Sequence, residues 1–120
     1  MAAQPIPRLT SEQYLEIERA SDTRHEYFNG EMLAMSGGSL SQSVIIFNLG
    51  GELRTALKPC PCRVMGQDMR TSVAYAGLYT YPDIVVVCGE SQYADNRQDT
   101  ITNPTLILEV LSPGTEAYHR

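Results

Sequence analysis

Apolar residues between positions 39 and 57 recur at steps of three and four, which is the period of one face of an α-helix. The positions that set this period are Leu40, Val44 and Phe47, followed by Leu49, Leu53 and Leu57. We therefore predict an amphipathic helix over 39–57, the longest element of the chain, which ends at Lys58-Pro59. Gly50 and Gly51 lie in its middle. They weaken the helix by about 2 kcal/mol relative to alanines, and they would permit close approach to a sheet.

Two shorter elements precede this helix. Residues 10–13, Thr-Ser-Glu-Gln, form a capping-box pattern, which predicts a helix that begins here and ends near Ala20. Asn29-Gly30 separates two short runs of apolar and polar residues, 25–28 and 31–35. Both residues tolerate positive φ, so this pair predicts a β-hairpin, and Gly37-Gly38 ends its second strand.

The second half of the chain is typical of strands. Segment 62–65 is a short strand, and 69–75 alternates in polarity. Residues 84–88 are continuously apolar after an opening Asp83, as in a central strand buried on both faces. Residues 106–111 predict a second buried strand with one acid inside it, Glu109, and the polar segment 89–103 predicts a surface loop. After a turn at 112–115, a last helix is expected to begin.

Together these elements predict an α/β fold, a mixed β-sheet flanked by helices. The length of 120 residues allows one domain, 1–120. The 9 basic and 14 acidic residues give a net charge of −5. A protein that coats nucleic acid is usually basic, so this charge excludes that class. It leaves a metal-dependent enzyme open, because a cation site must itself be acidic.

We expect neither a signal peptide nor a membrane-spanning helix in this sequence. The first seven residues contain two prolines and no apolar run, and no apolar stretch has the length of a membrane-spanning helix. Three cysteines are a sparse and odd set, which favours a reducing cytoplasm. The Cys60-Pro61-Cys62 segment has two interpretations, a turn that leads into a strand with small thiols beside it, or a redox or metal pair.

Asp83 and Glu109 carry the candidate chemistry. A carboxylate in a buried strand must be hydrogen-bonded, paired or bound to a metal. If the two strands lie side by side, both carboxylates reach one point and form a site for a hard cation, Mg²⁺ or Mn²⁺. Their spacing of 26 residues, 109 minus 83, is longer than a hairpin, so the loop at 89–103 must return the chain.

This arrangement is similar to the PD-(D/E)XK nuclease superfamily, and more closely the chain resembles its Uma-two family of putative restriction endonucleases. The stretches that carry the likeness are 10–15 (TSEQYL), 27–31 (YFNGE), 81–87 (YPDIVVV) and 108–115 (LEVLSPGT). The likeness implies a restriction-endonuclease-like fold whose last part lies beyond Arg120, and a metal-dependent phosphodiesterase. Asp83 and Glu109 would hold the cation, with the carbonyl of Val110 as a third ligand and Glu26 as a further acid of the site.

Two positions depart from the family pattern. Leu111 stands where the superfamily has a lysine, and in Uma-two relatives that lysine has moved into the helix after the turn at 112–115, beyond Arg120. The only lysine, Lys58, is expected at a helix end on the surface. Gln42 occupies a place where relatives often carry histidine. Glu31 shares the hairpin with Glu26 and is the alternative acid, while Asp68 is expected to cap a turn.

Two functions from different classes therefore remain. The first is a DNA endonuclease domain that uses Mg²⁺ or Mn²⁺ and acts as a homodimer, by likeness to nucleases that cut two strands. The second is a non-catalytic interaction or structural domain derived from such a fold, which the missing lysine and the acidic charge favour. A redox protein built on Cys60 and Cys62 is a third, weaker alternative.

Overall fold

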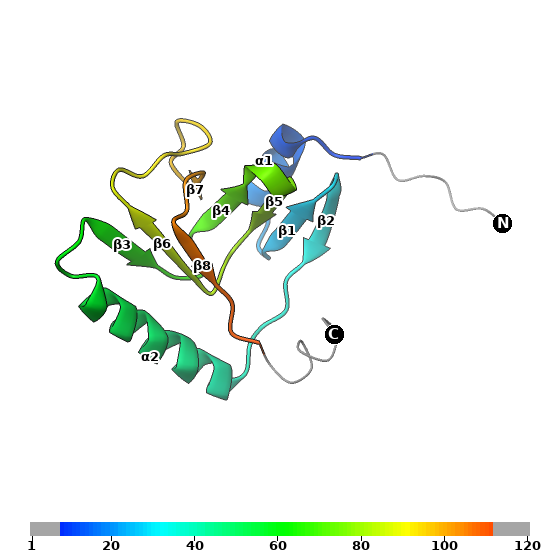
Figure 1. Cartoon of the computed structure of the whole chain (residues 1–120). Coiled ribbons are helices and arrows are strands. Elements are labelled where there is room, and N and C mark those ends of the chain that lie inside the picture. The colour runs from blue at the N-terminus through cyan, green and yellow to red at the C-terminus, as the bar shows by residue number, and fades with distance from the viewer. Residues whose placement is uncertain (1–7, 112–120) are drawn as a thin grey trace.

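The computed structural model describes residues 8–111 (Figure 1). The predicted turn at 112–115 and the helix after it lie outside these residues. The elements in chain order are α1 (Ser11–Arg19), β1 (His25–Phe28), β2 (Glu31–Ala34), α2 (Leu40–Ala56), β3 (Cys62–Met65), β4 (Arg70–Val73), the 3₁₀ turn η1 (Ala74–Ala76), β5 (Leu78–Thr80), β6 (Ile84–Cys88), β7 (Thr100–Ile101) and β8 (Leu106–Leu108). No helix within 8–111 is long and apolar enough to span a bilayer.

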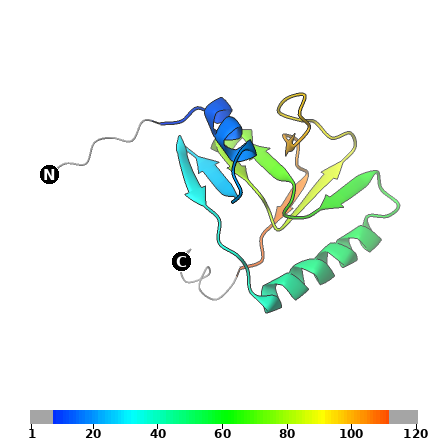
Figure 2. The ribbon, with the colours of Figure 1, turned by 180° about the vertical axis from the view of Figure 1, so that it is seen from behind.

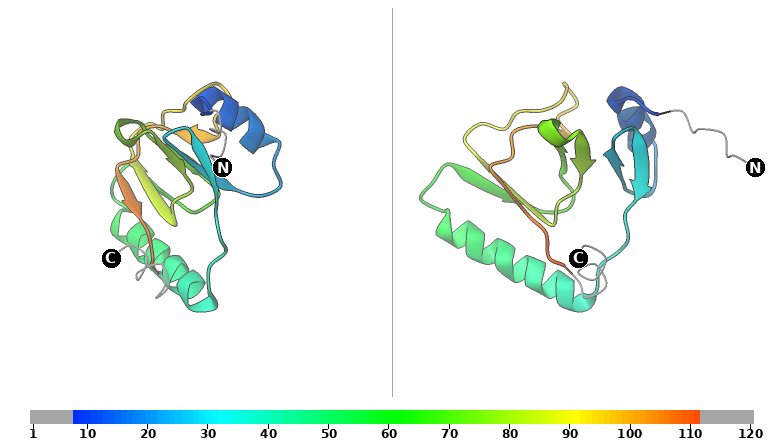
Figure 3. Two further views of the ribbon diagram at one scale, coloured as in Figure 1. Left: turned by 90° about the vertical axis from the view of Figure 1, so that its right-hand side faces the viewer. Right: turned by 45° about the vertical axis from the view of Figure 1, so that its right-hand side comes forward.

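The strands form two sheets. One has the order β2-β1-β5-β4-β7, with β7 parallel to β4 and the other neighbours antiparallel, and the second has the order β3-β6-β8 and is antiparallel. Helix α1 lies across the five-stranded sheet, in front of it in Figure 2. Helix α2 runs along the three-stranded sheet and contacts β3 (Figure 3). The predicted mixed α/β class is confirmed.

Local signals in the first half are confirmed. Thr10 and Gln13 form the predicted capping box, with the Thr10 hydroxyl accepting from the Gln13 amide at 3.1 Å. Asn29 and Gly30 adopt φ of 53° and 85°, which is the left-handed pair that a tight hairpin turn requires. Tyr14, Leu15 and Tyr27 form the buried cluster between α1 and β1, so this end of the fold is held by aromatic packing.

The long helix is confirmed, but the prediction of its packed face is partly wrong. Leu40 and Phe47 are 82% and 83% exposed. The half-buried apolar positions are the predicted Leu49, Leu53 and Leu57, together with Ile46, which was not predicted. The face of a helix that becomes buried depends on where its sheet lies, and the pattern alone contained more apolar residues than one sheet could cover.

β6 is the predicted central strand, and its residues Ile84 to Val87 are at most 2% exposed. The prediction for its neighbour is wrong in extent. β8 covers only 106–108 and lies at the edge of its sheet, so Glu109 follows the strand instead of lying within it. The strand predicted over 69–75 is also shorter, because the chain turns into η1 after Val73.

The segment 89–103, predicted as a surface loop, contains the short strand β7. Thr100 and Ile101 are both 1% exposed. Asp99 beside them pairs with Arg19 at 2.8 Å and with Arg70 at 2.9 Å. The Arg19 guanidinium in particular holds the pKa of Asp99 well below its usual range. These ion pairs fasten the end of the loop to α1 and β4, and from there the chain returns to β8.

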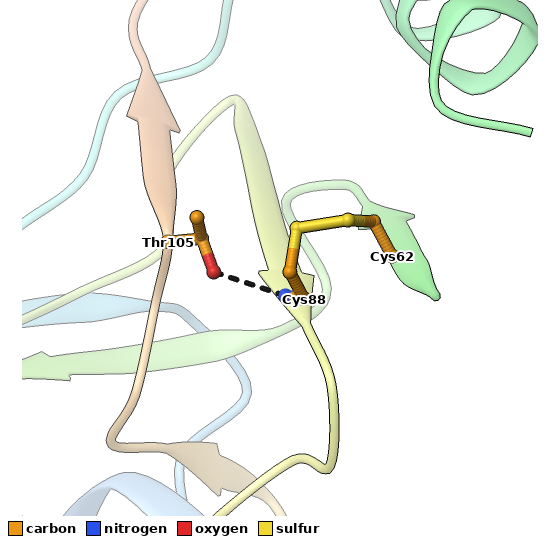
Figure 4. The surroundings of a disulfide bond; sticks show 3 residues. All are labelled: Cys62, Cys88 and Thr105. Carbon is orange, nitrogen blue, oxygen red and sulfur yellow. Dashed lines mark hydrogen bonds between the residues drawn. A yellow bond between two sulfur atoms is a disulfide. The ribbon is translucent and has the colours of Figure 1, made fainter. Parts of the chain in front are cut away.

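Cys62 and Cys88, directly opposed on β3 and β6, form a disulfide (Figure 4). The amide of Cys88 also donates to the hydroxyl of Thr105 at 2.9 Å. Cys60 is free and exposed. The predicted turn before β3 is therefore present, but the expectation of free thiols beside it is wrong for Cys62 and Cys88. Such bonds are typical of oxidising compartments, whereas the cysteine count favoured a reducing one.

The two central glycines of α2 offer a test of how this helix is stabilised. A Cβ at Gly51 would meet no atom within 4 Å, so Gly51→Ala adds helix propensity without a clash. We expect it to raise the free energy of unfolding by about 1 kcal/mol in urea titrations. Gly77→Ala is the contrasting variant, because φ of 63° at Gly77 strains an alanine and lowers stability. A Gly51→Ala protein no more stable than the wild type would contradict the prediction.

Candidate functional site

Asp83 is a buried carboxylate at the start of β6, and it is 6% exposed. Its two oxygens are both hydrogen-bonded. Oδ2 accepts from the amide of Val110 at 2.7 Å, and Oδ1 accepts from the side-chain amide of Gln67 at 2.6 Å. These donors offset the cost of removing the carboxylate from water, as the sequence analysis required of a buried acid.

The register of β6 and β8 places Glu109 next to Asp83. Ile84 is paired with Leu108 in this antiparallel ladder. Asp83, directly before Ile84, and Glu109, directly after Leu108, therefore lie side by side. Burial raises the pKa of Glu109 to about 7, and repulsion from Asp83 and then Glu26 acts in the same direction. Since Glu109 as a residue is exposed, solvent screens part of this effect.

Glu26 reaches the same place from the other sheet. It is half-buried on β1, and its carboxylate accepts a hydrogen bond from the Thr80 hydroxyl at 2.5 Å. Glu26, Asp83 and Glu109 all line one pocket of about 940 Å³, whereas Glu31 does not. The structure therefore brings the three acids named from the sequence to one pocket and favours Glu26 over Glu31.

The segment between β2 and α2, the first turn of α2 and the end of β8 lie near one another (Figure 1), and residues of all three line the pocket. Ser39 and Gln42 form a second capping box at the start of α2. The Gln42 side chain accepts from the Ser39 amide at 3.4 Å through Oε1 and donates from Nε2 to the carbonyl of Val110 at 2.5 Å. Because Oε1 faces an N–H group, the amide orientation is fixed and Nε2 must face the carbonyl.

Gln42 and Gln67 are site residues whose contacts the sequence did not predict. Gln67 is an exposed residue of the turn between β3 and β4, and nothing in its neighbourhood along the chain points to Asp83. Gln42 carried one usable signal, its place three residues after Ser39 in a capping-box pattern, which predicts where its Oε1 goes. That its Nε2 reaches Val110 depends on a contact 68 residues away.

The family model described as "Uma2: Putative restriction endonuclease" matches residues 11–120. The chain belongs to the Uma2 family. Two relatives are uncharacterised proteins of Synechocystis sp. PCC 6803. One is 39% identical over 118 residues, 97% of this chain and 60% of that protein, and the other is 32% identical over 112 residues, 93% of this chain and 63% of that protein. The chain thus spans about 60% of the length of these Uma2-like relatives.

A solved structure has the same fold. It is a crystal structure of a putative nuclease belonging to DUF820 from Anabaena variabilis, with a TM-score of 0.65 at 19% identity. The match covers 90% of this chain and 63% of that one. This likeness supports the restriction-endonuclease-like fold predicted for the Uma2 chain.

The other sequence-predicted positions of this Uma2 chain fall in different places. Lys58 follows α2, is exposed and does not line the pocket. Asp68 lies in the turn before β4 as predicted, but it also lines the pocket and forms an ion pair with Arg24. Arg24 had not been singled out from the sequence. Among residues 8–111 it is the only lysine or arginine that lines this pocket.

The acidic side chains of the pocket supply only some of the ligands that a hard cation needs, and the main chain and water would supply the others. Across the part of the chain that the structure describes, no three His, Cys, Asp or Glu side chains lie close enough together to hold a metal ion. Asp83 and Glu109 are adjacent, and the main-chain carbonyl of Val110 follows directly. Two carboxylates with a carbonyl and waters suit Mg²⁺, which is commonly held by one or two protein carboxylates.

The raised pKa of Glu109 predicts how stability changes with pH in the metal-free protein. The folded carboxyl, with a pKa of about 7 against 4.5 in the unfolded chain, keeps its proton where the unfolded chain has lost it. Stability is therefore highest below the unfolded pKa and falls as pH rises toward 7, by about 1 kcal/mol after allowance for solvent screening. Urea titrations with a chelator at about pH 5 and pH 8 measure this difference.

Glu109→Gln removes the titrating group and should flatten this dependence. Glu52→Gln changes an exposed glutamate of α2 outside the pocket and should leave it as in the wild type. Equal dependence in all three proteins would mean that the raised pKa of Glu109 is not the source of the pH dependence of stability.

Proposed function

We propose that this chain is a metal-dependent endonuclease domain that hydrolyses phosphodiester bonds of DNA with Mg²⁺ or Mn²⁺. The observation that carries the proposal is the strand register that sets Asp83 and Glu109 side by side in a pocket shared with Glu26. Three acids from three elements lower the stability of a protein through mutual repulsion, and a bound cation would remove that repulsion. Membership in the Uma2 family, whose description is "Putative restriction endonuclease", supports the same conclusion.

The residues that would hold the cation are Asp83, Glu109 and the carbonyl of Val110. Bound there, a cation supplies Lewis-acid chemistry, lowering the pKa of a bound water and stabilising charge that develops on phosphate. The chain supplies the positioning. Val110 donates to Asp83 through its amide while Gln42 donates to its carbonyl, so both ends of one residue are fixed beside the two carboxylates. Gln67 fixes the remaining oxygen of Asp83.

The substrate and assembly follow from the same proposal. By likeness to nucleases that cut both strands of a duplex, we propose that two copies of the chain act together as a homodimer. We propose that an enzyme with DNA as its substrate lies in the cytoplasm, where Cys62 and Cys88 would be reduced. The backbone ladder between β3 and β6 holds these strands in register without the sulfur bridge.

A non-catalytic interaction domain is the second candidate, and one observation favours it. Leu40 and Phe47, with Val44 at 50% exposure, lie at helical spacing on one face of α2 and form an apolar surface that no described residue covers. A domain built to bind a partner would keep such a surface. Plasmid cleavage with Mn²⁺ separates the two functions, since an interaction domain leaves the plasmid intact even when the metal binds.

Metal binding is the direct test of the proposed site. We expect Mn²⁺ to bind the wild type in calorimetric titration and to bind Asp83→Asn at least about tenfold more weakly, because a ligand charge is lost. Since the cation must displace the proton of Glu109, affinity should also rise about tenfold between pH 6 and pH 8. Asp22→Asn, an exposed acid outside the pocket, is the control. Equal affinities in wild type and Asp83→Asn would refute the ligand assignment.

The positioning of Val110 can be tested with the two capping boxes of this chain. Gln42→Met and Gln13→Met each remove a capping glutamine, but only Gln42 also donates to Val110. Both variants should lose about 1 kcal/mol of stability, as cap losses do. Only Gln42→Met should also weaken Mn²⁺ binding in calorimetry, by about three- to tenfold. If both variants bind Mn²⁺ equally well, Gln42 only caps its helix.

A further inference from the structure

The pocket that holds the three acids contains one basic side chain among the described residues, Arg24, directly before β1. We propose that Arg24 binds a backbone phosphate of the nucleic acid that enters this pocket. This inference rests on the proposed function and names the group that would contact the substrate's charge. It requires that Arg24 be held at the pocket, reach solvent and keep donors for a phosphate.

Three contacts hold the guanidinium at the rim of the pocket. Nη1 donates to the carbonyl of Gln67 at 3.3 Å, Nη2 pairs with Asp68, and Cζ lies 5.3 Å from the ring centroid of Tyr81. The hydrogen bonds involve two of the five N–H groups that a guanidinium carries. Arg24 is thus oriented by Tyr81 and the turn before β4, and it has donors beyond those contacts.

The partner of Arg24 is one that a phosphate can replace. The side chains of Arg24 and Asp68 are 47% and 94% exposed. An ion pair so exposed contributes about 0–1 kcal/mol, because water screens it. Arginine binds phosphate through two parallel N–H···O bonds, which are shorter and stronger than bonds between neutral groups. Exchange of the Asp68 carboxylate for a phosphate oxygen therefore costs little.

The charge of the pocket shows why such a residue is needed. Glu26, Asp68, Asp83 and Glu109 all line it, and at neutral pH they repel a phosphodiester. A cation at Asp83 and Glu109 would offset part of this repulsion. Arg24 supplies the only other positive charge among the lining residues that the structure describes.

A structural role for Arg24 makes a different prediction. If Arg24 only ties β1 to the turn at Asp68, removing either partner breaks the same contact, and both variants behave alike. If Arg24 binds phosphate, the two variants have opposite effects on DNA affinity. Arg24→Gln removes the ligand, whereas Asp68→Asn removes the carboxylate that competes with the phosphate.

The experiment measures fluorescence anisotropy of a labelled duplex of about 20 base pairs in Ca²⁺, between about 50 and 200 mM salt. We expect Arg24→Gln to weaken binding about tenfold and to reduce the slope of log affinity against log salt by about 0.9, the value of one phosphate contact. Asp68→Asn should bind more tightly than the wild type. Arg24→Lys keeps the charge and should keep the slope.

Arg97→Gln is the matched control, an exposed arginine of the loop before β7 that does not line the pocket. Equal slopes for Arg24→Gln and Arg97→Gln, or weaker binding by Asp68→Asn, would overturn the proposal. A second experiment titrates inorganic phosphate into the wild-type protein and measures its binding. If it binds the wild type at millimolar concentration while duplex affinity does not depend on Arg24, the residue serves a free anion and the proposal fails.

Mn²⁺ calorimetry separates this inference from the proposed function. Arg24→Gln should bind Mn²⁺ as the wild type does, since Arg24 is not a ligand. Failure of the wild type to bind Mn²⁺ would overturn the proposed function itself. Normal Mn²⁺ binding together with Arg24-independent DNA binding would overturn only the inference drawn here from Arg24.

Discussion

The buried charge of Asp83 is the constraint on which the site depends. A carboxylate that is 6% exposed requires hydrogen-bond donors, and this one receives them from two distant segments, the turn before β4 and the end of β8. Because the donor at the end of β8 is the backbone of Val110, the requirement fixes main chain as well as side chains. The neighbouring Glu109 is thereby held beside Asp83, although two like charges repel each other.

This arrangement keeps the pocket under electrostatic strain that the rest of the fold must support. Support comes from β6, whose apolar residues are buried between β3 and β8, and from the ion pairs of Asp99 that anchor the chain before it reaches β8. Asp83 and Glu109 thus lie at the ends of the paired strands β6 and β8, and Glu26 lies within β1. Such sites are common in enzymes, where stability is given up locally for a charge arrangement that a ligand completes.

Local sequence patterns predicted the helices, turns and strands better than they predicted how these elements pack against one another. The hairpin at Asn29-Gly30, the capping box at Thr10 and the buried strand β6 depend on neighbours in sequence. The exposed Phe47, the buried β7 and the short extent of β8 depend on how the sheets are placed. For the site, Asp83 was predicted because it is an acid at the start of a buried strand. Glu109 was predicted because it is an acid that interrupts an apolar run. Gln67 and Arg24 gave no such signal, because their contacts cross 16 and 43 residues of chain.

The apolar surface of α2 has a practical consequence. Dyes that become fluorescent on apolar surface report unfolding only when the folded protein hides such surface. Here Leu40 and Phe47 remain more than four-fifths exposed in the folded chain. The native protein would therefore give a high initial dye signal that decreases, or barely changes, on heating. Stability measurements on this chain should instead follow backbone dichroism or the fluorescence of its own tyrosines.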